Sequence, residues 1–287
     1  MITPPSHFFR KSDSHKASKG RLLVLAGSWG YAGAGLLCAQ AAVVAGCGYV
    51  IWKVPGRLYP VVAGNFLDGV VHPLEDDSIG YYVPRHIEEI LEGEFSAVVA
   101  GPGWGQHEKT GIFLQELIQR YQGPLLLDAD ALNLLVGKLE ILKTRKGESI
   151  LTPHPGEAAR LLGCTVEELQ QNREKACKEL YSLTSSTIIL KGKGTLVASN
   201  DKFWKNEYDS ATLATAGSGD VLSGMSAALL AAGIGAYEAS TFAVAWHGLA
   251  GQYLEKRIGP QGKGASALFE ALLEIQKEMY GENTSGQ

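Results

Sequence analysis

The sequence lacks the features that mark several large classes of protein. Its four cysteines form no C-x-x-C pair, so we expect reduced structural thiols in a cytosolic protein rather than a zinc site. Lys and Arg total 26 against 30 Asp and Glu, so the basic excess typical of nucleic-acid binders is absent. The first 20 residues contain no apolar segment of signal-peptide type, so we expect no signal peptide.

Long hydrophobic runs are also scarce, with one exception. Between positions 32 and 52 only Gln40 is clearly polar, which is a length sufficient to span a bilayer. The run contains four glycines, however, and Pro55 follows it closely. It is better interpreted as a buried helix, Gly35–Ala45, followed by a buried strand at 48–53. We therefore expect no membrane span and a cytoplasmic location.

Glycine is the residue in excess. The chain has 35 glycines among 287 residues, about 12% against a usual ~7%. No G-X-Y period accompanies them, so a collagen-like fold is excluded. In an otherwise ordinary globular composition, this excess indicates places where the backbone approaches a ligand closely.

Short apolar runs alternate with amphipathic runs, which predicts one doubly wound α/β domain over residues 20–280, between flexible tails at 1–19 and 281–287. The predicted strands are mostly continuous in hydrophobicity, as in parallel sheets buried on both faces: Arg21–Ala26, Tyr49–Lys53, Ala97–Ala100, Pro124–Asp128, Ser149–Leu151 and Thr187–Lys191. A predicted edge hairpin pairs Gly194–Ser199 with Lys202–Asn206. The predicted helices are Gly35–Ala45, His107–Tyr121, Gly156–Leu162, Val166–Leu183, Gly219–Ala232, Ala236–Lys256 and Ala265–Met279.

The strongest local pattern is the glycine-rich turn Thr215–Gly224, which leads directly into an apolar helix. The first amides of a helix lack intrahelical partners and the dipole is positive there, so Gly217, Ser218 and Gly219 predict an anion hole. Asp220 follows in the first turn, where its carboxylate could act as a base. Alternatively, Asp220 only stabilises the helix N-terminus electrostatically.

A second pattern, Leu-Thr-Pro-His-Pro-Gly-Glu at Leu151–Glu157, follows a short apolar strand. In open α/β sheets ligands bind at the carboxyl ends of the strands, and two prolines would hold His154 rigidly at that edge. Glu157 begins the next helix. A rigid turn with a capping acid is the structural alternative.

Two glycine-rich patterns directly follow predicted strands. Ala100–Gly105 holds three glycines and a proline, which suits either close approach to a ligand or a plain turn. Gly27–Gly35 is as dense in glycine as a dinucleotide-binding loop. Its spacing fits neither G-x-G-x-x-G nor G-x-x-x-x-G-K-[ST], so neither a Rossmann nor a Walker motif is indicated.

Charged groups occur in two more patterns. In Leu127–Asn133, Asp130 could N-cap a helix, and Asp128 with Asp130 could help to hold a divalent cation through water; a cap and a structural Asp fit equally well. In Lys191–Thr195 the lysines and exposed amides could meet nucleotide phosphates, or the lysines could be merely solvated. Five of the six patterns fall where a strand ends, so we expect them to share one edge of the sheet.

In this order the patterns resemble those of the ADP- or ATP-dependent NAD(P)H-hydrate dehydratases, whose fold is ribokinase-like. The similarity covers residues 17–280, and the loop Leu151–Glu157 is its most specific part, since related vitamin-precursor kinases tend to carry Asn at His154. It departs at 208–215, where the family more often has Asn and additional Gly. It implies a mainly parallel sheet flanked by helices on both faces, and a dehydratase domain without the epimerase domain to which it is often fused.

The resemblance also implies an activity, the repair of damaged nicotinamide cofactor. (S)-NAD(P)H hydrate would be dehydrated to NAD(P)H with hydrolysis of ADP, the nucleotide of bacterial relatives, or of ATP. Asp220 would activate the ring hydroxyl, and the anion hole at Gly217, Ser218 and Gly219 would hold the transferring phosphoryl group. The remaining implied contacts are Lys191, Gly192, Lys193, Gly194, Thr195 and Gly219 for the nucleotide, Gly35, Gly103, His154 and Asp220 for the hydrated cofactor, and Glu157 for Mg²⁺. Asp128 is a second metal candidate, from the residues alone.

Two other functions stay open at this point. A small-molecule kinase of the same fold would phosphorylate a hydroxymethylpyrimidine- or thiazole-type alcohol. A nucleotide-binding protein without turnover is the third candidate, although Asp220 and the intact Gly217–Gly219 turn argue against it. The family resemblance further implies a homo-oligomer, with a tetramer expected, and neither nucleic acid nor membrane is an expected partner.

Overall fold

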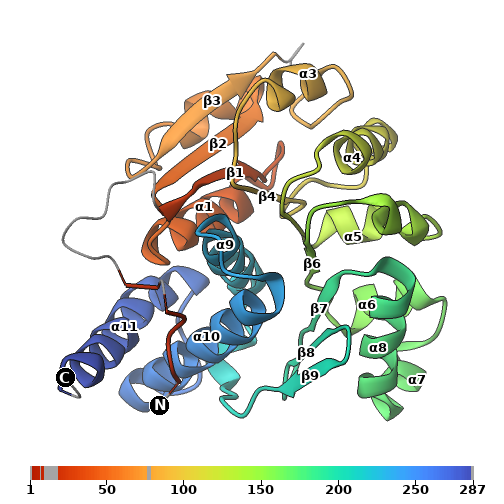
Figure 1. Ribbon diagram of the computed structural model, residues 1–287. Helices are drawn as coiled ribbons and strands as arrows, with labels where there is room; N and C mark the ends of the chain where they lie inside the picture. The colour runs from red at the N-terminus through yellow and green to blue at the C-terminus, as the bar shows by residue number, and fades with distance from the viewer. Residues whose placement is uncertain (1, 7, 10–18, 76–78, 286–287) are drawn as a thin grey trace.

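The continuous apolar strands pair into one sheet. The computed structural model describes residues 2–6, 8–9, 19–75 and 79–285, and these form a nine-stranded sheet in the order β3-β2-β1-β4-β5-β6-β7-β8-β9 (Figure 1). β1 to β7 run parallel, whereas β8 and β9 form the predicted antiparallel edge hairpin. The strands are β1 Arg21–Leu25, β2 Tyr49–Pro55, β3 Val70–Leu74, β4 Ala97–Ala100, β5 Leu125–Leu127, β6 Ser149–Leu151, β7 Thr187–Leu190, β8 Leu196–Ser199 and β9 Lys202–Lys205.

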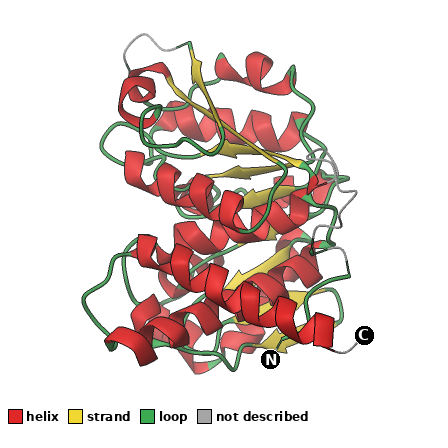
Figure 2. Cartoon of the chain, turned by 90° about the vertical axis from the view of Figure 1, so that its left-hand side faces the viewer, coloured by secondary structure: helices red, strands yellow, loops and turns green. Residues whose placement is uncertain are grey.

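Helices pack on both faces of the sheet (Figure 2). One face carries α1 Ala32–Val44, α2 Tyr59–Val62, α9 Ser218–Ala231, α10 Ala236–Ile258 and α11 Leu268–Ser285. The other carries α3 His86–Leu91, α4 Glu108–Arg120, α5 Asp130–Leu134, α6 Pro155–Leu162, α7 Val166–Gln171 and α8 Arg173–Thr184. Short 3-10 helices occur at η2 Gly56–Leu58, η3 Leu139–Thr144, η4 Ala211–Leu213 and η5 Ala265–Ala267. The predicted three-layer α/β arrangement is therefore confirmed.

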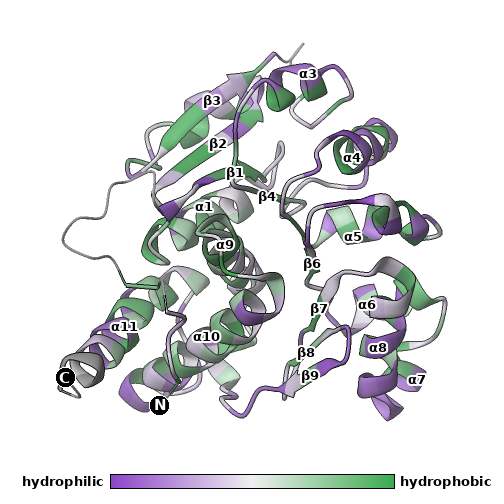
Figure 3. Ribbon diagram, in the orientation of Figure 1, coloured by the Kyte–Doolittle hydropathy of each residue, from purple (hydrophilic) through white to green (hydrophobic). Residues whose placement is uncertain are grey.

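Successive side chains of each strand point to opposite faces of the sheet, and both faces are buried. The strands therefore show no amphipathic pattern. In β1, Leu22 and Val24 enter the hydrophobic cluster beneath α1, α9 and α10, while Leu23 and Leu25 enter the cluster on the opposite face. Each strand residue is thus buried on one side or the other, as a doubly covered parallel sheet requires. Figure 3 shows the contrast with α7 and α8, which are coloured largely hydrophilic.

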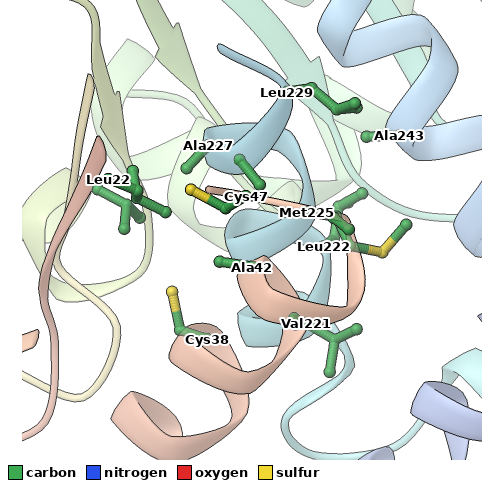
Figure 4. Packing of buried hydrophobic residues seen from close by; sticks show 14 of the residues in the cluster. Leu22, Cys38, Ala42, Cys47, Val221, Leu222, Met225, Ala227, Leu229 and Ala243 are labelled. Atoms are coloured by element: carbon green, nitrogen blue, oxygen red, sulfur yellow. The ribbon is translucent and has the colours of Figure 1, made fainter. Parts of the chain in front are cut away.

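The small-residue run at 32–52 packs inside the protein. Helices α1 and α9 cross closely, and a Cβ on Gly224 would lie only 2.1 Å from the carbonyl oxygen of Cys38. Figure 4 shows Cys38 and Ala42 of α1 beside Val221 and Met225 of α9. Among the described residues no helix has both the length and the apolar character needed to cross a membrane. The close crossing fixes the N-terminus of α9 above the sheet.

The edge strands of the sheet are β3 and β9, and β3 is a strand that the sequence analysis missed. Its residues are mostly exposed, and Pro73 interrupts the run, so neither burial nor propensity indicates a strand there. Lys202 and Lys205 begin and end β9 at the opposite edge. The short helices α2 and α3 were likewise not predicted.

One predicted helix is divided in two. The single helix expected over Val166–Leu183 breaks at Asn172, whose φ of −146° and ψ of 70° are not helical. The Asn172 side chain accepts a hydrogen bond from the amide of Lys175 at 3.0 Å and so caps α8. Thr165 caps α7, within a capping box completed by Glu168.

Near both ends of the chain, described residues are packed against aromatic side chains or helical. Phe8 packs edge-on against Phe242 and Trp246, with ring centroids 4.9 and 5.2 Å away, and Phe9 contacts Tyr280 in the same way. Helix α11 continues to Ser285, beyond the expected boundary at 280. Residues 1, 7, 10–18, 286 and 287 lie outside the described part of the chain. The four cysteines are free thiols, as expected.

Candidate active site

The loops after β5, β6 and β7 meet the N-terminus of α9 around a cavity of about 740 Å³. The strand-end patterns therefore do share one edge, which is the edge where open α/β sheets bind ligands. The predicted site residues that line the cavity are Asp128, His154, Glu157, Lys191, Gly192, Lys193, Thr195, Gly217, Ser218, Gly219 and Asp220. Gly194 lies beside it, and its amide donates to Asp209 Oδ1 at 2.8 Å.

A half-buried lysine, Lys191, joins the acidic residues at the base of the cavity. Lys191 Nζ lies 2.7 Å from Asp128 Oδ1 and 3.9 Å from Glu157 Oε2. Asp128 is only 1% exposed, and its second oxygen accepts a hydrogen bond from Ser223 Oγ at 2.7 Å. A Cβ on Gly219 would lie 3.3 Å from Lys191 Nζ, which places the start of α9 directly on this group. We call Lys191, Asp128, Glu157 and Asp220 the Lys191 cluster.

The crowded charges shift the pKa values within the Lys191 cluster. Burial, with Asp128 as the next largest cause, raises the pKa of Asp220 to about 7. Burial also raises the pKa of Glu157 to about 7, although Lys191 opposes the shift. Burial alone would lower the pKa of Lys191, but Asp128 and Glu157 outweigh it and raise that pKa. Asp220 can therefore take up and release a proton near neutral pH.

Backbone amides face the cavity from two sides. α9 begins after Gly217, whose φ of +89° is a left-handed conformation, and a Cβ there would lie 2.4 Å from Leu37 Cδ1. Within the described part of the chain, the amides of Gly219 and Asp220 donate to no protein group, and neither do those of Gly192 and Lys193. Two pairs of donors thus remain for an anion such as a phosphoryl group.

His154 is both a helix cap and a wall of the cavity. Its Nδ1 accepts from the amides of Gly156 and Glu157 at 3.0 and 3.3 Å, and Glu157 Oε2 accepts from the His154 amide at 2.7 Å. Burial, with Lys191 and Arg160 nearby, lowers the pKa of His154. The structure thus contains the rigid capped turn, while the role of this loop as a ligand site stays a prediction.

The comparisons with known proteins decide the family. A model of the NAD(P)H-hydrate dehydratase family matches residues 22–274. The chain belongs to this family. It is 37% identical to the ADP-dependent (S)-NAD(P)H-hydrate dehydratase of Neisseria meningitidis over 263 residues, which are 87% of this chain and 82% of that one. It spans about half the length of the bifunctional NAD(P)H-hydrate repair enzymes that it also matches.

Solved structures agree with this assignment. An ADP/ATP-dependent NAD(P)H-hydrate dehydratase from Bacillus subtilis, co-crystallised with ATP and Mg²⁺, superposes with a TM-score of 0.82 over 94% of both chains at 28% identity. A ribokinase-like protein from Enterococcus faecalis gives a TM-score of 0.77 at 24% identity over 94% of this chain. The predicted ribokinase-like fold is thereby confirmed.

Two predicted contacts of this dehydratase family member lie outside the cavity. A Cβ on Gly35 would lie 2.3 Å from the Trp52 ring, and one on Gly103 would lie 2.8 Å from Ala34 Cβ. Both glycines thus allow close packing around the N-terminus of α1. This packing alone accounts for glycine at the two positions, and their contact with substrate stays a prediction.

The predicted role of Asp130 as a helix cap was wrong. Ala129, with a φ of +53°, occupies the N-cap of α5, and Asp130 is the first helical residue. Asp130 Oδ2 instead accepts the amide of Gly105 at 2.8 Å. This bond ties the loop after β4 to the loop after β5, because neighbouring parallel strands end side by side.

Several cavity residues were not predicted from the sequence. They come from the segment before α9 and from α10, and they include Asn206, Asp209, Ser210, His247 and Glu255. His247 lies 3.3 Å from Ser218 Oγ, and burial lowers its pKa to about 4, so it is neutral. The only sequence signal for this wall was the departure from the family pattern at 208–215.

Replacing Asp220 with asparagine is expected to stabilise the protein more at pH 8 than at pH 5. The folded-state pKa of Asp220, about 7, lies above its ordinary value in an unfolded chain, ~3.9. The carboxyl therefore favours folding fully below about pH 4, and this contribution is lost as the pH rises through 7. Asparagine stays neutral throughout.

Urea unfolding of both proteins at a series of pH values measures the difference. Asp201→Asn, in the exposed β8–β9 turn, is the matched control. A stability difference between wild type and Asp220→Asn that does not change with pH would contradict the raised pKa.

Proposed function

We propose that the chain dehydrates (S)-NAD(P)H hydrate to NAD(P)H and hydrolyses ADP or ATP in the process. The observation that carries this proposal is the position of Asp220. Its carboxyl has a pKa of about 7 and stands beside unpartnered amides at the start of α9, in a cavity that also holds the Lys191–Thr195 loop. The similarity to dehydratases named ADP-dependent and ADP/ATP-dependent supports it.

In the proposed reaction Asp220 removes the proton of the substrate hydroxyl. The hydroxyl oxygen then attacks the terminal phosphorus, and the bond from that phosphorus to the leaving nucleotide breaks, which gives AMP from ADP or ADP from ATP. The amides of Gly219 and Asp220 hold the transferring phosphoryl oxygens. Loss of phosphate from the ring, together with a proton from the adjacent carbon, restores the double bond. The net change is removal of water from the ring and hydrolysis of one phosphoanhydride bond.

The residues fit a Mg²⁺ ion only if it is bound largely by the nucleotide. Both carboxylate oxygens of Asp128 are engaged, by Lys191 and Ser223, so the predicted role of Asp128 as a metal ligand is not supported. The described residues contain no group of three or more His, Cys, Asp or Glu placed to hold a metal. Mg²⁺ commonly binds through phosphates and one or two carboxylates, and Glu157 and Asp220 face the cavity. When bound there, the ion would neutralise phosphate charge.

The direct test mixes purified protein, Mg²⁺, hydrated NADH and either ADP or ATP, and follows near-ultraviolet absorbance. Return of the reduced-nicotinamide band with phosphate release is expected, and it identifies the nucleotide. A stable phosphorylated alcohol without return of the band would favour the kinase alternative. The same preparation tests two further predictions, the tetramer by light scattering and NADH against NADPH hydrate by relative rate.

His154→Ala is expected to raise KM for the hydrate roughly tenfold, the equivalent of one lost contact of ~1.4 kcal/mol, and to raise KM for the nucleotide less. Alanine also removes the cap of α6, at a cost of about 1 kcal/mol of stability. His154→Asn separates the two effects, because asparagine is a good cap: stability should return while KM for the hydrate stays high. A larger effect on KM for the nucleotide would overturn the proposed role.

A further inference from the structure

Arg173 makes an unusual set of contacts with the loop that follows β7. It is the first residue of α8, directly after the break at Asn172. One terminal nitrogen of its guanidinium donates to the carbonyl oxygens of Leu190 and Lys191, each at 3.1 Å. The other donates to the carbonyl oxygens of Lys193 and Gly194. A single side chain thus binds four carbonyls within five consecutive residues.

These bonds determine which way the loop presents its amides. The carbonyls on either side of Gly192 are directed to Arg173, and Gly192 itself has a φ of +124°. This positive φ favours glycine, and a Cβ there would also lie 3.2 Å from the guanidinium, closer than most Cβ contacts. In this conformation the amides of Gly192 and Lys193 make no bond to described protein groups, and both residues line the cavity.

The orientation of the Arg173 guanidinium is determined by its bonds to the loop. Its Nε is buried without a partner, and no other buried side-chain nitrogen or oxygen of the described residues is in that position. The guanidinium is therefore oriented so that its two terminal nitrogens reach the four carbonyls, while its Nε–H is left without an acceptor. Helix α8 packs on the sheet through Ala176, Cys177 and Leu180 instead, so its docking does not depend on the guanidinium.

We infer that Arg173 is a positioning residue for the nucleotide: it holds the 190–194 loop in the conformation whose free amides donate hydrogen bonds to nucleotide phosphate oxygens. Arg173 does not line the cavity, so it acts through the loop and not on the ligand. The inference rests on the proposed function only in that the ligand of this loop is a nucleoside di- or triphosphate. A lysine cannot reproduce it fully, because an ammonium group lacks the planar fork that reaches both pairs of carbonyls.

The test measures Mg-ADP and Mg-ATP binding by calorimetry, together with KM for nucleotide, KM for hydrate and kcat. Arg173→Met keeps the length and packing of the side chain and removes all four bonds. We expect it to weaken nucleotide binding at least tenfold and to leave KM for the hydrate within twofold. Arg173→Lys should recover part of the affinity. Lys175→Met, an exposed cation on the same helix, is the matched control and should bind as wild type does.

The outcomes separate this inference from the proposed function. Unchanged nucleotide affinity in Arg173→Met overturns the inference, and so does a parallel rise of both KM values with a lowered Tm, which would mark a merely structural role. Wild-type protein that binds no nucleotide overturns it as well. Wild-type protein that binds nucleotide without dehydrating the hydrate would refute the proposed function, while the binding measurement still tests Arg173.

Discussion

Replacing Asp220 with alanine or asparagine is expected to lower kcat by roughly 10²–10⁴-fold, the usual contribution of a general base, while nucleotide binding is retained. The carboxyl faces the cavity beside the amides of α9, and it bonds to none of the described groups that build the site. Its removal therefore leaves the Lys191–Asp128 pair and the two pairs of amides in place. Asparagine in particular also relieves repulsion from Asp128, so nucleotide affinity should hold or improve.

Steady-state rates and calorimetric titration with ADP and ATP check this prediction. In the wild type kcat should rise with pH through about 7, because the base must lose its proton. Asp201→Asn, an exposed change in the β8–β9 turn, should match wild type. If Asp220→Asn lost nucleotide affinity and turnover to the same extent, Asp220 would be a structural residue at a helix N-terminus.

Lys191→Met is expected to be the most destabilising single change in the site, by about 3–5 kcal/mol, because it removes one partner of a buried ion pair. The Lys191 side chain is 18% exposed and Asp128 only 1%, so methionine would leave a carboxylate in the interior without its cation. Glu157, 3.9 Å from the same ammonium, would lose its neutralising charge as well. Nucleotide binding should fall together with stability.

Thermal unfolding of single and double variants separates charge from packing. Asp128→Asn combined with Lys191→Met removes both members of the pair and should recover a large part of the lost stability. Lys193→Met is the matched control, since this neighbouring lysine makes no ion pair among the described residues. A Tm for Lys191→Met equal to that of wild type would show that the ion pair contributes nothing to folding.

The layers of this fold could be predicted because a strand buried on both faces is apolar at every position of the sequence. Runs such as Ala97–Ala100 are apolar at every position, which only a doubly covered strand explains. The location of the site followed from the same logic, since all parallel strands end at one edge. Strand β3 shows no such pattern, because an exposed edge strand with Pro73 looks like a loop.

The partners of the site residues could not be predicted in the same way. Asp128 was predicted either to help hold a metal ion or to be a structural Asp, and its oxygens accept from Lys191, 63 positions away, and from Ser223, 95 positions away. Pairings at such separation depend on how elements pack, and residue types alone do not specify them. Asn172 illustrates the local counterpart: helical periodicity continues across it, yet its side chain is a better cap than a helix interior residue.

The two outermost strands bear on how the protein behaves when it is concentrated. An open sheet presents an unpaired row of backbone groups at each margin, and a second molecule can add its own strand there and begin a fibre. At one margin Pro73 removes a donor from β3, and at the other Lys202 and Lys205 place a positive charge at each end of β9. A second molecule that paired with β3 would lack a hydrogen-bond donor at Pro73. One that paired with β9 through its own β9 would bring lysines of like charge together. Edge-to-edge association is thus disfavoured at both margins of the sheet.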